Sequence, residues 1–260
     1  MSGQARARRA LEARAQAIEA RLTGLATTDS GLRLVVALLS SVTNTASPSA
    51  ESAVAVPPEA ADEIFAASPA SPLLKARLAA SYSGSAIGDQ HWIRVNRGPE
   101  PWTPPDERLF GVPDASGSLP PTVKPFDSGL YTSTPLTAGY SMWRLYLDQY
   151  YGSTLFPLPW YTWNLTSLPE ARVVTVDDAR GWTRLVTSFP RVHDGSVYPD
   201  WLGIASRYDG VRVTFPAVIA TQGIRFLTPH GPTAPGFWDV ESTYWLRWRF
   251  TNATLVTTTV

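Results

Sequence analysis

Residues 239–250 read DVESTYWLRWRF, and this stretch indicates more about the fold than any other. Its large side chains alternate, with Tyr244, Leu246, Trp248 and Phe250 in one set and Trp245, Arg247 and Arg249 in the other. A period of two is typical of a β-strand with two distinct faces. We expect its tryptophans to lie in a core and not on a ligand platform, because tryptophan buries a large area in small mixed folds. The segment therefore predicts a packed strand near the end of the chain.

Short strands and short helices are predicted upstream of this segment. β-Branched and aromatic residues indicate strands at 91–95 (HWIRV), 129–134 (GLYTST), 172–176 (RVVTV) and 211–215 (VRVTF). Helices are expected after the capping residues Ser141, Asp177 and Asp178, and after Pro199. Two stretches that combine prolines and aromatic residues, 98–126 and 156–163, are expected to be irregular loops. Because helices and strands mix without regular βαβ alternation, we expect an α+β fold.

The aromatic residues divide the chain into two regions. All ten tryptophans lie between Trp92 and Trp248, whereas residues 1–90 contain two aromatic residues, Phe65 and Tyr82. This shift in composition predicts a boundary near residue 90. Residues 91–260 are expected to form an aromatic-rich α+β domain behind a helical N-terminal region.

The N-terminal region is expected to contain helices at 1–43, a linker at 44–58 and a helical lead-in at 59–90. Within residues 4–26, helical spacing gives one apolar stripe formed by Leu11, Ala15, Ile18, Leu22 and Leu25. Such a stripe packs on its own protein in most helices, and the alternative is a docking helix for a protein partner. The short apolar run at 32–39 is below the roughly 20 residues that cross a bilayer. We therefore expect a soluble chain with no membrane span and no clear signal peptide.

The composition argues against several classes of function. The 22 basic and 22 acidic residues give a formal net charge of zero, which argues against general nucleic-acid binding. The absence of cysteine excludes disulfides, thiolate zinc sites and cysteine nucleophiles. His91, His193 and His230 are too far apart for a local metal-binding motif, so no metal is expected. Neither a Walker loop, nor GxGxxG, nor GxSxG occurs in the sequence.

One ordered set of polar residues stands out in the aromatic-rich region. Arg94 lies in the first predicted strand, a Ser/Thr-rich strand follows, and an acid-x-glutamate pair precedes the last strand: Tyr131, Thr132, Ser133 and Thr134, then Asp239 and Glu241. This order resembles the arginine / Ser-Thr-Ser / acid-x-glutamate pattern of toxin-type ADP-ribosyltransferases. The segment Tyr208-Asp209-Gly210-Val211 also resembles one found before a strand in several such toxins and in RES-type NAD-degrading domains.

The resemblance implies that residues 91–260 form the catalytic domain, with a mixed β-core around bound NAD. It also implies a role for each residue of the ordered set. Arg94, Ser133, Thr134 and Tyr131 would contact NAD, and Glu241 and Asp239 would serve catalysis. A guanidinium grips a pyrophosphate well, which suits Arg94. A fixed carboxylate stabilises the positive ribose of an oxocarbenium-like state, which suits Glu241, and Ser133 would order that carboxylate by hydrogen bonding. Tyr131 or Trp143 would stack on nicotinamide.

Two departures from the family pattern affect what the resemblance implies. The serine-rich strand here reads Thr-Ser-Thr at 132–134, and Asp239 stands where the family usually has Glu or Gln. Since that position usually contacts the target, the macromolecular acceptor stays open. Each residue also has an ordinary structural interpretation: Arg94 in a salt bridge, Ser133 in a strand and Asp239 in a turn.

The function expected from the resemblance is NAD-dependent mono-ADP-ribosyl transfer, or NAD hydrolysis. A non-enzymatic alternative is a structural or assembly protein of a virion or particle, with exposed tryptophans at its interface. Arginine outnumbers lysine 20 to 2, which is typical of a GC-rich bacterial or phage genome. A carbohydrate-binding module with tryptophan platforms is a further alternative, although it leaves the Arg–Ser–Glu order unexplained.

Overall fold

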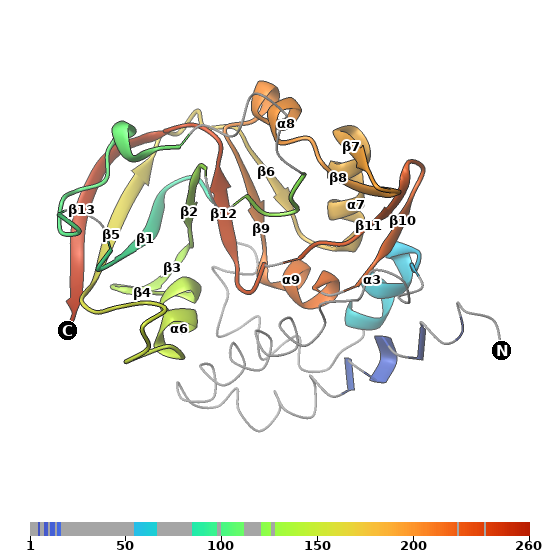
Figure 1. Ribbon diagram of the computed structural model, residues 1–260, viewed down its shortest axis with the longest axis horizontal. Coiled ribbons are helices and arrows are strands. Elements are labelled where there is room, and N and C mark those ends of the chain that lie inside the picture. Colours follow the sequence, from blue (N-terminus) through green and yellow to red (C-terminus); the bar gives the residue numbers. More distant parts are fainter. Residues whose placement is uncertain are drawn as a thin grey trace.

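The computed structural model describes most of the chain from residue 85 onward and parts of the N-terminal region. The described residues are 5, 8–9, 11–13, 15–16, 55–66, 85–97, 100–111, 121–125, 128–222, 224–236 and 238–260. The predictions for residues 17–54 and 67–84 lie outside this set, as does the helix expected after Ser71. Within the described residues, helices and sheets combine in an α+β fold (Figure 1).

Seven strands form the centre of the fold. One sheet has the order β1-β5-β13, with bounds Asp89–Val95, Trp160–Ser167 and Phe250–Thr259. The other has the order β2-β12-β9-β6, with bounds Leu130–Thr132, Ser242–Trp245, Gly210–Val213 and Val173–Val176. An antiparallel bridge between His91 of β1 and Ser133, the residue that follows β2, joins the two sheets. Every pairing in these sheets is antiparallel except that of β6 with β9.

Helices and three small hairpins surround this centre (Figure 1). The helices are α3 (Pro58–Ala66), η1 (Glu107–Leu109), α6 (Met142–Asp148), α7 (Ala179–Ser188), α8 (Trp201–Arg207) and α9 (Phe215–Thr221). The hairpins pair β3 (Pro135–Thr137) with β4 (Tyr140–Ser141), β7 (Pro190–His193) with β8 (Ser196–Pro199), and β10 (Phe226–Thr228) with β11 (Gly231–Thr233). None of the described helices is long and apolar enough to cross a membrane.

Local sequence signals explain where several elements begin and turn. The Ser141 side chain accepts a hydrogen bond from the backbone N of Arg144 and caps α6, while Asp178 accepts one from Gly181 N at 2.6 Å and caps α7. Both caps satisfy backbone donors that a helix start leaves free. The β7–β8 turn places Asp194 and Gly195 at φ 46° and 69°, the twist that a two-residue hairpin requires.

The core lies on both sides of β12. Tyr244 and Trp245 point to opposite faces, and both side chains are fully buried. Six of the ten tryptophans are buried: Trp160, Trp163, Trp182, Trp201, Trp238 and Trp245. The expectation that the C-terminal aromatic run forms core is therefore confirmed for Trp245, whereas Trp248 is half-buried.

The predicted C-terminal strand is shorter than the alternation suggested. β12 ends at Trp245, because the backbone N–H groups of Leu246 and Arg247 donate to the carbonyl of Asp209 at 2.8 and 3.3 Å. Residues 246–249 leave the sheet, and β13 then begins at Phe250. The prediction of one continuous strand through residue 250 was wrong, since a period of two does not reveal where strand pairing ends.

Other boundaries also differ from the sequence predictions. The second expected loop ends early, since β5 starts at Trp160 and runs through the center of its sheet. The predicted strand 211–215 ends at Val213, and α9 starts at Phe215 with Pro216 in its first turn. Val56 lies in the predicted linker, but it is buried and bridges to Phe226. Tertiary pairing decided each of these points.

The described part of the N-terminal stripe packs on its own chain. Leu11 and Ala15 are buried, and Leu11 belongs to a small apolar cluster with Val56, Ala179 and Phe226. This contact favours the first interpretation of the stripe, a helix packed on its own protein, over a docking helix.

Candidate functional site

The Ser/Thr-rich strand and the acid-x-glutamate segment meet at one buried point. Ser133 Oγ donates to Glu241 Oε2 at 2.7 Å, and the Thr134 backbone N donates to the same oxygen at 3.0 Å. Thr134 Oγ1 donates to Glu241 Oε1 at 2.8 Å. β2 and β12 are antiparallel neighbours, which brings together residues that are far apart in sequence. The hydrogen bond from Ser133 to Glu241 that the resemblance implied is present.

The arginine beside this carboxylate is Arg212, which the sequence analysis did not single out. Arg212 Nε lies 3.3 Å from Glu241 Oε1, and both side chains are 0% exposed. Burial raises the pKa of Glu241, while Arg212 and the hydrogen bonds from Ser133 and Thr134 lower it. Burial likewise lowers the pKa of Arg212 against the opposing effect of Glu241. A charge inside the apolar strand VRVTF was the available signal, because a buried arginine needs an acidic partner.

Arg94 lies apart from this cluster. The backbone bridge pairs His91 with Ser133, and Arg94 is three residues farther along β1, a rise of about 10 Å. Arg94 Nη1 donates to the Thr103 carbonyl at 3.4 Å, and its guanidinium carbon lies 6.0 Å from the Trp92 ring centroid. These contacts join Arg94 to the segment around Thr103. The structure therefore gives the place beside Glu241 to Arg212 and not to Arg94.

Tyr131 and Asp239, the remaining predicted site residues, lie around a buried lysine. Lys124 Nζ lies 4.8 Å from the ring centroid of Tyr131, 5.1 Å from that of Trp238 and 5.9 Å from that of Trp143. Burial lowers the pKa of Lys124 to about 8, and the charge of Asp239 opposes this shift. We call Lys124, Tyr131, Trp143, Trp238 and Asp239 the lysine cage. The cage accounts for Tyr131 and Trp143 as cation–π partners within the protein.

The described conformation limits what the Glu241 cluster can do. Its contacts from Ser133, Thr134 and Arg212 join Glu241, just before β12, to the end of β2 and to β9, and Glu241 has no exposed surface. In this conformation the cluster is a polar link between the central strands, and a substrate reaches Glu241 only after the side chains over it move. In the part of the chain that the structure describes, no group of three His, Asp or Glu side chains could hold a metal ion.

Comparison with known proteins gives no assignment. No protein-family model matches the chain, and neither a curated protein nor a solved structure matches it. Any functional conclusion therefore depends on the geometry of the chain itself.

Proposed function

We propose that the chain cleaves the nicotinamide–ribose bond of NAD, with Glu241 as the carboxylate beside the ribose. The observation that carries this proposal is the set of hydrogen bonds from Ser133 and Thr134 to Glu241. A carboxylate fixed in this way has its negative charge oriented before the reaction begins. The order of these residues and their contact agree with the resemblance to toxin-type ADP-ribosyltransferases.

Cleavage of NAD requires Glu241 to stabilise positive charge on the ribose. The bond between ribose C1′ and the nicotinamide nitrogen breaks, and its electron pair leaves with nicotinamide. The ribose then carries positive charge, which a nearby carboxylate stabilises until water or an acceptor nucleophile attacks C1′. Asp239 interacts with Lys124 in the lysine cage, so its contacts do not identify an acceptor, and hydrolysis by water is the first reaction to test.

The burial of Glu241 adds a requirement to this proposal. A carboxylate with no exposed surface cannot contact a ribose, so NAD binding must open the protein above it. The described conformation is then a closed resting form. Arg212 holds Glu241 in that form and is a positioning residue.

Nicotinamide release from NAD by the full-length protein tests the proposal. We expect Glu241→Gln to lower the rate by about a hundredfold or more, as the loss of one transition-state contact does. Glu170→Gln, an exposed carboxylate, is the matched control and should keep the wild-type rate. Ser133→Ala should lower kcat more than it changes KM, because it keeps the ion pair but loosens the carboxylate.

Loss of the fold is a competing explanation for a silent variant. Glu241→Gln leaves the Arg212 charge buried without its carboxylate, which commonly costs about 3–5 kcal/mol. The double variant Glu241→Gln, Arg212→Gln removes both charges, and circular dichroism shows whether it folds. Release by the folded double variant at the wild-type rate would disprove the role of Glu241. Absence of release by the wild-type protein, with and without candidate acceptor proteins, would overturn the enzymatic proposal.

A second candidate function, assembly with other copies, is favoured by β13. This strand lies at the edge of its sheet among the described residues, and its sequence FTNATLVTTT contains no charge and no proline. Leu255 and Val256 are 43% and 38% exposed on it. Long uncharged edge strands pair readily with another strand.

Light scattering tests this second candidate. Self-association that Leu255→Lys or Val256→Lys abolishes would support an assembly role. A wild-type protein that stays monomeric at high concentration would exclude edge-to-edge assembly of identical chains.

A further inference from the structure

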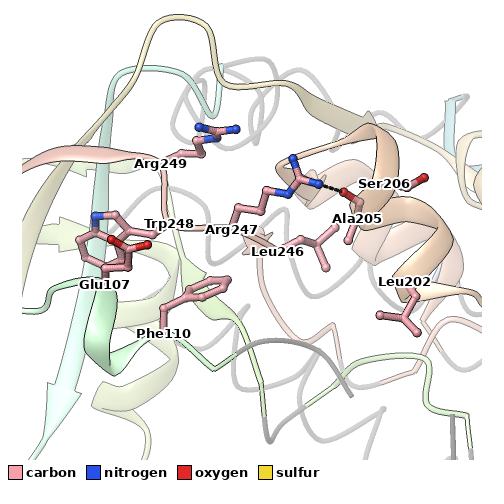
Figure 2. A pocket seen from close by; sticks show the side chains of 9 residues that line it. All are labelled: Glu107, Phe110, Leu202, Ala205, Ser206, Leu246, Arg247, Trp248 and Arg249. Atoms are coloured by element: carbon pink, nitrogen blue, oxygen red, sulfur yellow. Dashed lines mark hydrogen bonds between the residues drawn. The ribbon is translucent and has the colours of Figure 1, made fainter. Parts of the chain in front are cut away.

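The segment that leaves the sheet between β12 and β13 lines a pocket of about 550 Å³ (Figure 2). Arg247, Trp248 and Arg249 contribute to its wall from this segment, and Glu107 and Phe110 contribute from the η1 region. Figure 2 shows the two guanidinium groups in one part of the wall and the rings of Trp248 and Phe110 in another. A volume of this size is within the range of small-molecule sites.

Three arginines gather around one carboxylate at the edge of this pocket. Asp209, with a 2% exposed side chain, lies 3.1 Å from Arg249 Nε, 3.6 Å from Arg247 Nη1 and 3.8 Å from Arg172 Nε. One carboxylate balances one of the three positive charges. Glu107 is an exposed carboxylate that also lines the pocket, and the three arginines outnumber Asp209 and Glu107 together.

The contacts of Arg247 and Arg249 within the protein leave some of their N–H donors available to a ligand. Arg247 Nη2 donates to the Ala205 carbonyl at 2.7 Å, while Arg249 faces Asp209 through Nε. A guanidinium carries five N–H donors, more than these contacts occupy. The side chains of Arg247 and Arg249 are 43% and 34% exposed, so an anion can reach them.

We propose that this pocket binds a small phosphorylated molecule that carries a planar ring. Arg247 and Arg249 bind its phosphate, since a guanidinium matches phosphate oxygens in geometry and charge. Trp248 and Phe110 contact its ring, since flat rings stack favourably on aromatic side chains. Asp209 holds the arginines in place before the ligand arrives. Glu241 does not line this pocket, and binding there requires no cleavage of NAD.

Isothermal titration calorimetry with four probes tests the proposal at roughly physiological salt. The probes are adenosine monophosphate, adenosine, ribose 5-phosphate and inorganic phosphate, which separate the contribution of the phosphate from that of the ring. We expect adenosine monophosphate to bind more tightly than each of the others. The double variant Arg247→Gln, Arg249→Gln should weaken this binding by about tenfold or more, because charge-assisted hydrogen bonds are lost.

Matched variants make the result specific. Arg184→Gln removes an exposed arginine of α7, whose residues do not line this pocket, and should leave binding unchanged. Trp248→Leu should weaken binding of adenosine monophosphate more than that of inorganic phosphate. In the double variant Arg172 still faces Asp209, and circular dichroism verifies the fold. A folded double variant that binds adenosine monophosphate as the wild type does would overturn the proposal. So would adenosine binding as tightly as its monophosphate, or no binding by the wild type at about 1 mM ligand.

Discussion

Lys124 gives the sharpest quantitative prediction for this chain. Lys124 is 5% exposed within the lysine cage, and burial lowers its pKa to about 8 from an ordinary value of 10.5. Between these two values the unfolded chain holds a proton on Lys124 that the folded chain has released. Stability therefore rises with pH in this window, because the unfolded state binds more protons.

The two pKa values also set the size of the effect. Proton linkage makes the contribution of Lys124 to the free energy of unfolding rise by about 2 kcal/mol between about pH 7.5 and about pH 9.5. Burial raises the pKa values of Tyr131 and Tyr244, and a raised pKa makes stability fall as pH rises. Their effect begins near the ordinary tyrosine pKa of about 10, so measurements stop at about pH 9.5.

Urea denaturation followed by circular dichroism at several pH values measures this effect. Lys124→Met keeps the length of the side chain without a titrating group, so its stability should change less with pH by about 2 kcal/mol. Lys124→Arg keeps a charge at every pH and should be the less stable of the two variants at neutral pH. If the wild type and Lys124→Met change in parallel over the whole range, Lys124 does not titrate in this window and the cage argument is wrong.

Three further predictions concern stability. Gly129→Ala should destabilise the fold by about 2 kcal/mol or more in thermal unfolding, since Gly129 has φ +68° and an added Cβ would lie 2.1 Å from a ring carbon of Tyr244; an unchanged melting temperature would contradict this. Burial lowers the pKa of His91, so its contribution to stability is lost as pH falls below about 6.5. In urea titrations, His91→Gln should therefore lose less stability than the wild type between about pH 7 and about pH 5. Equal losses would show that His91 does not contribute. Asp178→Ala removes the cap of α7 and should lower the free energy of unfolding by about 1 kcal/mol, whereas Asp178→Asn should lower it less. Chemical denaturation measures both variants, and the opposite ranking would contradict the capping role.

Local signals in the sequence predicted the fold best where the physics is local. Ser141 and Asp178 cap helices as expected, because a cap depends on donors within one turn of the helix. The strand at 91–95 appears as β1, which begins at Asp89. The sequence did not predict β5 as a central strand, since its residues follow a proline-rich stretch and its role depends on two distant partners, β1 and β13.

The sequence likewise predicted one part of the candidate site and missed another. The resemblance named Ser133, Thr134 and Glu241, and the pairing of β2 with β12 brings these three together. It also named Arg94, for the NAD pyrophosphate, and Arg94 lies apart from this cluster. The arginine beside Glu241 is Arg212 of β9, which the sequence analysis did not name. Residue order along the chain cannot show which of two strands lies next to the carboxylate.

The sequence by itself determined the α+β class, the aromatic-rich region beyond residue 90 and the burial of much of its tryptophan. These features follow from composition, periodicity and capping, which act over a few residues. Only the tertiary structure decided that Glu241 and Arg212 form a buried ion pair and that Lys124 lies among aromatic rings. It also decided that three arginines meet at Asp209 beside a pocket. The physical reason is that burial and ion pairing depend on neighbours brought together by strand pairing, and some of those neighbours lie more than a hundred residues apart in the chain.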